Sequence, residues 1–200
     1  EENGWMWYIR YSAADNREKS LMIATTRPET LLGDVALAVN PHDDRYKGWV
    51  DKQVRVPVIG RFIPVISDES IDKDFGTGCV KITPAHDFND YAVGNRHRLP
   101  LITIFDLQAQ ILSKAKHYQG YGHCILTGEE PLPHFLAGKD REMARHLMVE
   151  ALQKEGALIK TEPHRLMVPK GDRTGTIIEP MLTDQWFVSM NKTPKKGVYS

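Results

Sequence analysis

The sequence is a series of short strand-like runs closed by turn residues, and this pattern limits the folds open to it. Two β-prone runs, Trp5 to Tyr11 and Leu21 to Thr26, flank a polar turn and predict a hairpin. Further runs lie at 35–41, twice within 53–68, and at 79–83. Short strands separated by turns every eight to twelve residues or so favour a β-barrel over a parallel, doubly wound sheet.

The clearest predicted helix covers Asp140 to Glu155. Apolar residues recur there at intervals of three and four, and Gly156 stands where a helix would end. This stripe is expected to pack in the core: Ala144, Leu147, Met148, Ala151 and Leu152. Glycines and prolines between Asp106 and Leu136 predict a loop-rich excursion. After Leu166, two more strand-like runs flank a turn at Gly171 to Arg173.

Size and charge exclude several classes of protein. The 200 residues suffice for one domain with its own core, and 26 basic residues balance 26 acidic ones. A zero net charge gives no general attraction to nucleic acid or membrane, and no apolar run reaches membrane-spanning length. Two isolated cysteines, Cys79 and Cys124, are too few for a disulfide framework or zinc site and favour a reducing compartment.

The stretch from Phe75 to Tyr91, FGTGCVKITPAHDFNDY, combines a Gly-X-Gly turn, a short strand and a cluster of polar residues. In its short strand, alternation places Lys81 and Thr83 on one face, and Pro84 then ends the strand. If a helix follows, Asp87 and Asp90 share one side of it, because they are three residues apart. A lysine, a threonine and two aspartates therefore converge at the mouth of a strand and form a polar pocket.

Three interpretations of His86, Asp87 and Asp90 remain open. The first is a capped helix start, with Asp87 in the cap and the other two solvated. The second is a metal site, although no further histidine has ligand-like spacing. The third is a pocket for a ligand carrying an ammonium, paired with Asp90, and a hydroxyl, recognised by its polar neighbours. Buried opposite charges would pair with each other unless a ligand competed, which favours a polar substrate.

A second polar group follows the first hairpin in TTRPET. Thr26 and Glu29 have the spacing of a capping box, which would make them a helix start. Alternatively, Thr25, Thr26 and Arg27 form a row of donors lining a site. The sequence contains no Gly-X-Ser-X-Gly elbow and no defensible Ser-His-Asp or Cys-His arrangement, so an enzyme of this sequence would use a positioned water.

Two motifs, ATTRPETLLGD (24–34) and GTGCVKITPAHDFNDYAVGNRH (76–97), resemble the editing domain of valyl-tRNA synthetases. This domain is the large connective insertion of the class I synthetases for valine, isoleucine and leucine. GDR at 171–173 and IEPMLTDQWFV at 178–188 resemble the segment that leads back into the catalytic domain. Lys81 and the run ITPAHDFNDY are closer to the valyl enzymes than to their relatives.

The resemblance implies an α+β fold, with one editing domain over residues 1–200 that has a β-barrel core and flanking helices. Residues 1–10 and 189–200 would be linker or β-ribbon to a catalytic domain, so we expect a piece of a longer protein. The HIGH and KMSKS signatures do not occur, which places the ATP-using synthetic site outside this chain and leaves the domain without a cofactor or metal.

The implied activity is post-transfer hydrolysis of mischarged threonyl-tRNA(Val), with hydrolysis of threonyl-adenylate left open. In the family pattern Asp90 holds the substrate's ammonium, while Lys81, Thr83 and Asp87 recognise the threonine side chain. Thr25, Thr26 and Arg27 would hold the terminal adenosine and the ester, and Phe75 would stack on the adenine. Asp90, Thr25, Thr26 and Lys81 are the candidate catalytic residues.

The expected partners are the tRNA(Val) acceptor end, the threonyl ester and the rest of the synthetase. We expect a monomer in the cytoplasm, with a mitochondrial location left open. Candidate contacts to the tRNA backbone are Arg96, Arg98, Lys170 and Arg173. The alternatives are a non-catalytic module that docks the acceptor end, an editing domain of the isoleucyl or leucyl relatives, and a metal-dependent hydrolase.

Overall fold

The computed structural model describes residues 2–166 together with Pro180 and Leu182. The predicted hairpin is present: β1 (Glu2–Ala13) pairs antiparallel with β2 (Ser20–Thr25). The other predicted runs also form strands: β3 (Ala36–Val39), β4 (Gln53–Arg55), β5 (Phe62–Ser67) and β6 (Cys79–Ile82). Their alternating or wholly apolar sequences bury at least one face of each strand, which is why they form a sheet.

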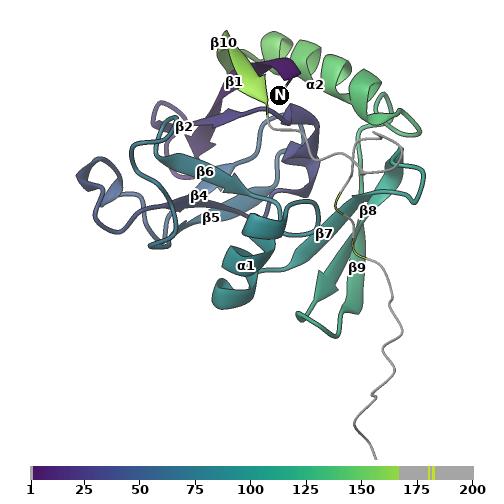
Figure 1. Cartoon of the computed structure of the whole chain (residues 1–200), viewed down its shortest axis with the longest axis horizontal. Coiled ribbons are helices and arrows are strands. Elements are labelled where there is room, and N and C mark those ends of the chain that lie inside the picture. Colours follow the sequence, from purple (N-terminus) through teal and green to yellow (C-terminus); the bar gives the residue numbers. More distant parts are fainter. Residues whose placement is uncertain (1, 167–179, 181, 183–200) are drawn as a thin grey trace, which may run out of the picture.

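These strands form a barrel-like sheet. Seven strands of the described chain pair in the order β10-β1-β4-β5-β3-β6, with β2 beside β1 and with β10 (Leu158–Leu166) at one edge. β3 and β5 run parallel, and the other neighbours are antiparallel. Because β6 returns to the side of β2, the sheet curls into a nearly closed barrel (Figure 1). The expected α+β class with a barrel core is confirmed.

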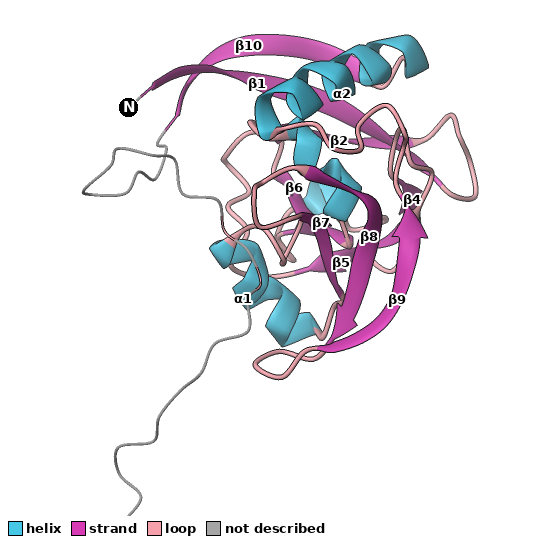
Figure 2. Cartoon of the chain, turned by 90° about the vertical axis from the view of Figure 1, so that its right-hand side faces the viewer, coloured by secondary structure: helices cyan, strands magenta, loops and turns pink. Residues whose placement is uncertain are grey.

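Two α-helices flank the barrel in the part of the chain that the structure describes: α1 (Phe88–His97) and α2 (Arg141–Glu155). Figure 2 shows α2 lying along β1 and β10, with α1 at the opposite side of the molecule. Asp140 caps α2 by accepting the amide of Met143 at 2.9 Å, and Gly156 ends it in a left-handed conformation. Of the predicted core stripe, Ala144, Met148 and Leu152 are fully buried, while Leu147 and Ala151 are half-buried.

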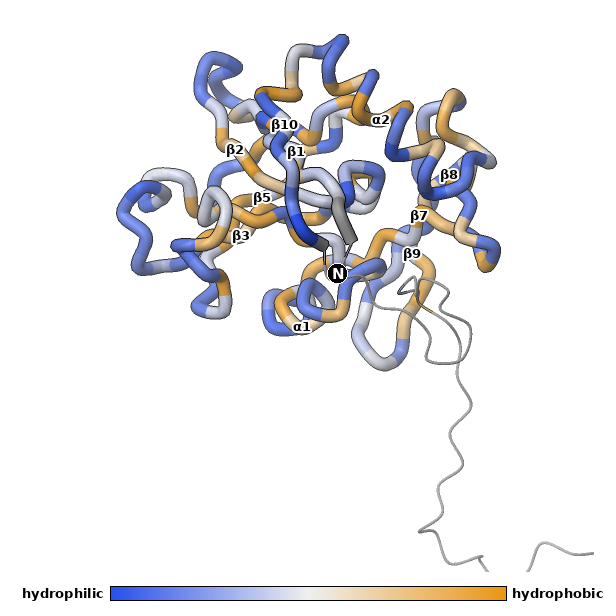
Figure 3. Tube along the Cα trace, turned by 45° about the horizontal axis from the view of Figure 1, so that its top comes forward, coloured by the Kyte–Doolittle hydropathy of each residue, from blue (hydrophilic) through white to orange (hydrophobic). Residues whose placement is uncertain are grey.

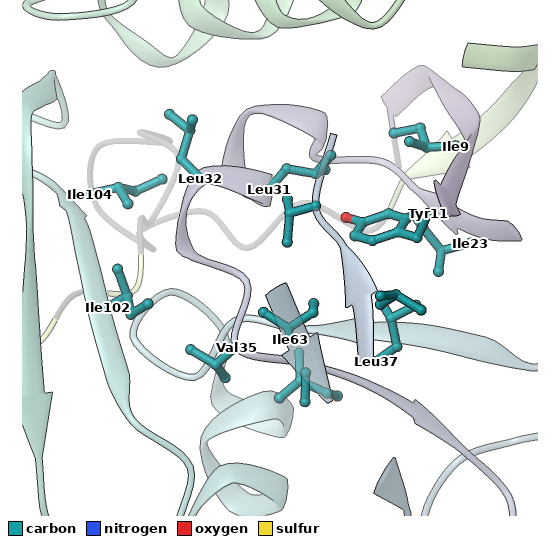
Figure 4. Close-up of a cluster of buried hydrophobic side chains, with 14 of the residues drawn as sticks. Ile9, Tyr11, Ile23, Leu31, Leu32, Val35, Leu37, Ile63, Ile102 and Ile104 are labelled. Atoms are coloured by element: carbon teal, nitrogen blue, oxygen red, sulfur yellow. The ribbon is translucent and has the colours of Figure 1, made fainter. Parts of the chain in front are cut away.

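The core lies between the barrel and the short 3₁₀ helix η1 (Pro28–Gly33). Leu31 and Leu32 from η1 are fully buried, and Tyr11 and Ile23 from the hairpin pack in the same cluster (Figure 4). Figure 3 shows the apolar strands inside and the hydrophilic loops outside. Among the described residues, no helix has the length and apolar character to cross a membrane.

The predicted loop-rich excursion between Asp106 and Leu136 is wrong. Two strands occupy this region, β8 (Ile111–Gln119) and β9 (Ile125–Pro131). They form a three-stranded antiparallel sheet with β7 (Leu101–Phe105), which precedes the region, in the order β7-β8-β9. The glycines at 120 and 122 belong to the turn between β8 and β9, while Gly128 lies within β9. Because β9 is an exposed edge strand, its sequence lacks the apolar alternation that marks a half-buried strand.

Two further features differ from expectation. The capping box of Thr26 and Glu29 is wrong, because η1 begins after Arg27 and no side chain caps it. Strand β10 was not foreseen, since its sequence contains Pro163, which sheets tolerate at an edge. Of the predicted N-terminal linker or ribbon, residues 2–10 lie within β1 and pair with β2 and β10. The predicted strands after Leu166, and residues 189–200, lie outside the described residues.

Candidate functional site

A cavity of about 1,000 Å³ opens where the end of β2, the end of β6 and the start of α1 meet. All eight sequence-predicted site residues line it: Thr25, Thr26, Arg27, Phe75, Lys81, Thr83, Asp87 and Asp90. Along the chain, the first of these eight residues is Thr25 and the last is Asp90, 65 positions later. The lining also includes residues that the sequence did not indicate, among them Met6 of β1 and His164 of β10.

Asp87 begins α1 and also faces the cavity. Its Oδ1 accepts the backbone amides of Asn89 at 2.8 Å and Asp90 at 3.1 Å, which is the geometry of an N-cap. The capped-start interpretation is therefore correct for Asp87. It is wrong for His86, which is fully buried rather than solvated.

Asp90 lies one turn into α1 and points back to the end of β6. Its Oδ2 accepts the backbone amide of Thr83 at 2.8 Å, which fixes the carboxylate at the cavity wall. Burial raises the pKa of Asp90 to about 7, and the ammonium of Lys81 offsets only part of this effect. A carboxyl group of this kind ionises readily when a cation binds beside it, because a nearby positive charge favours the charged form.

Lys81 and Thr83 meet a partner that the sequence did not indicate, Asp34. The Lys81 ammonium donates to Oδ1 of Asp34 at 3.1 Å and to the Thr83 hydroxyl at 2.5 Å. Thr83 donates to the same Oδ1 at 2.8 Å, and Tyr11 donates to Oδ2 at 2.6 Å. Burial raises the pKa of Asp34, and Lys81 opposes this shift. A carboxylate between the apolar runs LL and VALAV was the available signal, since a buried charge needs a partner.

Arg27 is held at the cavity wall by its neighbours. Its Nη1 donates to the carbonyl oxygen of His86 at 2.9 Å, and its backbone amide donates to the Thr25 hydroxyl at 3.1 Å. Glu29, fully buried, lies with Oε1 3.8 Å from Nε of Arg27. Both Glu29 oxygens accept from Arg145 of α2, at 2.7 and 2.9 Å. Glu29 thus joins the outer helix to the cavity.

His86 has a structural role. Its Nε2 accepts the amide of Ile104 at 3.0 Å, so the ring proton is on Nδ1, which lies 3.3 Å from the carbonyl oxygen of Pro180. Burial, with Arg27 nearby, lowers the pKa of His86 to about 3. The histidine is therefore neutral and used by the fold. Within the described residues, no group of three or more His, Cys, Asp or Glu side chains could bind a metal ion.

Phe75 lies on a turn at the cavity rim, with 57% of its surface exposed. The turn is fixed from outside the cavity by η2 (Asp44–Tyr46): the Tyr46 hydroxyl donates to the carbonyl of Thr77 at 2.5 Å. Gly78 has a φ of +74°, and a Cβ there would lie 2.5 Å from the Arg45 guanidinium. Glycine is favoured at this position by the positive φ and by the backbone oxygen of Lys73, which a Cβ would approach to 2.8 Å.

The basic residues predicted to contact a tRNA backbone have different placements. Arg96 is bound to both oxygens of Asp68, at 2.9 and 3.0 Å, and lines the cavity. Arg98 follows α1 as its C-cap and is exposed. Lys170 and Arg173 lie outside the described residues.

The chain matches part of several valine--tRNA ligases. It is 57% identical over 197 residues to the enzyme of Neisseria meningitidis serogroup B, covering 98% of this chain and 21% of that protein. It is 55% identical over 192 residues to the enzyme of Chromobacterium violaceum, covering 96% and 20%. For Legionella pneumophila strain Paris, identity is 50% over 188 residues, covering 94% and 18%. The chain therefore spans about a fifth of the length of these relatives. No protein-family profile matches it.

Two solved structures have the same fold. One is a ternary complex of Agrobacterium radiobacter K84 agnB2 LeuRS with tRNA and LeuAMS, with a TM-score of 0.54 and 17% identity over 80% of this chain and 20% of that one. The other is GlLeuRS-CP1, with a TM-score of 0.52 and 16% identity. The match covers 80% of this chain and 100% of that one. The expected fold, that of the synthetase connective insertion, is confirmed by this likeness.

Proposed function

This chain is homologous to one segment of the valine--tRNA ligases, and on that premise we propose that it is the post-transfer editing domain of such an enzyme. The proposed reaction hydrolyses the ester that joins threonine to the terminal adenosine of tRNA(Val). Threonine and valine are nearly isosteric, and an apolar synthetic pocket rejects the added hydroxyl only weakly. This pair is itself a standard example, with a discrimination of about 10². A second site that demands the hydroxyl would supply the missing specificity.

The observation that carries the proposal is that Asp90 and the Lys81–Thr83 pair line one cavity. An amino acid ester has an ammonium and, in threonine, a hydroxyl one carbon further on. Asp90 is anchored through Oδ2 to the Thr83 amide, and no described residue hydrogen-bonds to its Oδ1, which we propose to bind the ammonium. The raised pKa of Asp90, about 7, allows the carboxylate to form fully when that cation arrives.

The adenosine end of the substrate fits the other side of the cavity. Phe75 is exposed at the rim and offers a face on which an adenine can stack, a contact worth about 1–3 kcal/mol. Thr25 ends β2 and Thr26 follows it; both line the same space, where their polar groups would orient the ribose and the ester. Arg27 is positioned beside them by its bond to the His86 carbonyl.

In this proposal the protein acts by positioning. A water molecule attacks the ester carbonyl carbon, the bond from that carbon to the ribose oxygen breaks, and the ribose oxygen takes up the proton. The products are free threonine and deacylated tRNA. An aminoacyl ester is already activated, and fixing its geometry supplies much of the rate enhancement. We assign no general base and no cofactor, and we propose that Asp90 acts by anchoring the substrate.

The tRNA acceptor end and the rest of the synthetase are the proposed partners. Homology to the ligases supports the second, and the tRNA in the related LeuRS complex supports the first. The zero net charge of the chain implies that contacts outside this domain provide much of the affinity for tRNA.

The test is a calorimetric titration with two non-hydrolysable aminoacyl-adenosine analogues, one threonyl and one valyl. We expect tighter binding of the threonyl analogue and loss of that binding in Asp90→Ala. In the full ligase, Asp90→Asn should abolish threonyl-tRNA hydrolysis mainly by weakening substrate binding; unchanged affinity with lost turnover would contradict the anchoring role. Two results would instead indicate a docking module. One is equal binding of both analogues; the other is binding of tRNA whatever amino acid it carries, with no hydrolysis of the ester.

A further inference from the structure

The Asp34 carboxylate is the centre of a buried network behind the cavity wall. It follows η1 directly, is fully buried, and accepts hydrogen bonds from Tyr11, Lys81 and Thr83. Tyr11 belongs to the core cluster, and Figure 4 shows its ring among the surrounding aliphatic side chains. Asp34 itself does not line the cavity, whereas Lys81 and Thr83 do. Asp34 therefore does not contact a ligand directly: its hydrogen bonds act through Lys81 and Thr83, and its charge also acts on Asp90.

The network fixes the direction of the Thr83 hydroxyl. A threonine hydroxyl has one proton to donate and two lone pairs that accept. Its proton goes to Oδ1 of Asp34 at 2.8 Å, because the ammonium of Lys81 can only donate. One lone pair accepts from Lys81 at 2.5 Å. What remains for a ligand is one lone pair, so Thr83 meets the cavity as an acceptor.

Counting the hydrogen bonds of Lys81 in the same way leaves one of its N–H groups for a ligand. Its ammonium has three N–H groups, of which one goes to Asp34 and one to Thr83. The pair therefore offers a ligand one donor and, beside it, one acceptor. A hydroxyl satisfies both at once. A methyl group satisfies neither, and an ether or carbonyl oxygen satisfies only the donor.

We propose that Asp34 is a specificity-determining positioning residue: by taking the Thr83 proton, it makes the cavity require a ligand group that both donates and accepts. This inference rests on the proposed editing function and identifies what selects its substrate side chain. Tyr11 binds the other carboxylate oxygen, Oδ2, and has no hydrogen bond to Oδ1, Lys81 or Thr83 among the described residues.

The experiment uses three non-hydrolysable adenosine analogues that carry threonyl, O-methylthreonyl and valyl groups, titrated by calorimetry at pH 7.5. O-methylthreonine keeps the acceptor oxygen of threonine and loses its donor. In the wild-type chain we expect the threonyl analogue to bind at least about tenfold more tightly than either of the others, since one unpaired polar group costs that much or more. In Asp34→Ala the Thr83 proton becomes available to the ligand, so the threonyl to O-methylthreonyl ratio should fall to within about threefold of one.

Tyr11→Phe is the matched control, because it removes a hydrogen bond from Asp34 on the Oδ2 side and leaves Oδ1 unchanged. It should keep the threonyl to O-methylthreonyl ratio of the wild type. A ratio that persists in Asp34→Ala would show that the added methyl is rejected by size, or that another acceptor in the cavity such as Asp87 requires the donor, and either result would overturn the inference. Loss of the ratio in both variants would also overturn it, since Oδ1 would then have no special part.

The wild-type chain alone also tests the inference, should Asp34→Ala fail to fold. If threonyl and O-methylthreonyl analogues bind alike while the valyl analogue binds weakly, the editing function stands and the role of Asp34 is refuted. If all three bind alike, the proposed function itself fails. A carboxyl ¹³C measurement of Asp34 adds an independent check: it should show an ionised group at pH 7.5, and a protonated one would overturn the inference.

Discussion

The ion pair between Glu29 and Arg145 provides the sharpest test of how the cavity is supported. Glu29 is fully buried on η1, and both of its oxygens accept from the guanidinium of Arg145, whose side chain is 27% exposed. The Arg145→Ala variant would leave that carboxylate with the Arg27 Nε, 3.8 Å away. Removing one partner of a buried pair typically costs 3–5 kcal/mol, and partial exposure of Arg145 with the remaining Arg27 contact lowers this expectation to about 2–4 kcal/mol.

Urea unfolding monitored by circular dichroism measures this loss as a lower midpoint at constant slope, since the surface exposed on unfolding is nearly unchanged. His146→Ala is the matched control on the same helix, because its side chain is 69% exposed and its pairing with Glu150 is a surface contact. That control should cost less than about 0.5 kcal/mol. Arg145→Lys should fall between the two, because lysine keeps the charge but cannot bind both oxygens.

The same variant should also weaken binding in the cavity. Without Arg145, the Glu29 carboxylate attracts the Arg27 guanidinium, which then leaves the His86 carbonyl that positions it at the cavity wall. We expect at least a severalfold weaker affinity for the threonyl-adenosine analogue in the folded Arg145→Ala variant. If that variant were as stable as His146→Ala and bound the analogue normally, the reasoning that links α2 to the cavity through Glu29 would be refuted.

Three more predictions concern single positions. Phe75→Ala should weaken binding of an adenosine-containing analogue by about 1–3 kcal/mol in calorimetry, while Phe62→Ala, equally exposed but outside the cavity lining, should leave it unchanged. Gly78→Ala should destabilise the chain by about 2 kcal/mol in urea unfolding, because the φ of Gly78 is +74° and a Cβ there would approach a backbone oxygen to 2.8 Å. A Cβ at Gly48 would have no atom within 4 Å, so the control Gly48→Ala should change stability by less than about 0.5 kcal/mol. Burial raises the pKa of Asp90 to about 7 in the folded chain, above its unfolded value of 3.8. The stability that the protonated Asp90 carboxyl contributes is therefore lost as pH rises from about 4 through 7. In urea unfolding, Asp90→Asn should gain stability relative to wild type from about pH 5 to about pH 8.

Local patterns in the sequence were sufficient to bring four of the site residues together: Lys81, Thr83, Asp87 and Asp90. Alternation along the strand before Pro84 correctly put Lys81 and Thr83 on one face, and the three-residue spacing put Asp87 and Asp90 on one side of α1. These relations extend over at most a few residues, where strand and helix geometry alone determine which side chains are neighbours. The roles assigned to these residues remain predictions.

Contacts between distant parts of the chain could not be predicted in this way. Asp34 binds Lys81 and Thr83 across 47 and 49 residues, and no local period relates them. Glu29 shows the same limit more directly. Its spacing from Thr26 indicates a capping box, but Arg145, 116 residues away, binds both of its oxygens and determines where it points. Leaving the buried Glu29 charge without Arg145 would cost more than the roughly 1 kcal/mol that a helix cap contributes.

The polar cluster after Pro84 shows how the two kinds of information combine. Its sequence does not determine which side chains face a ligand, because His86, Asp87 and Asp90 are equally polar. Once Asp87 caps α1, helix geometry turns Asp90 back toward the Thr83 amide, and the preceding His86 points inward to the Ile104 amide. The burial that makes His86 neutral and structural also raises the pKa of Asp90, which remains at the cavity wall. One cap thus separates a residue that holds the fold from a residue suited to hold an ammonium, and exchanging their roles would require α1 to begin at a different residue.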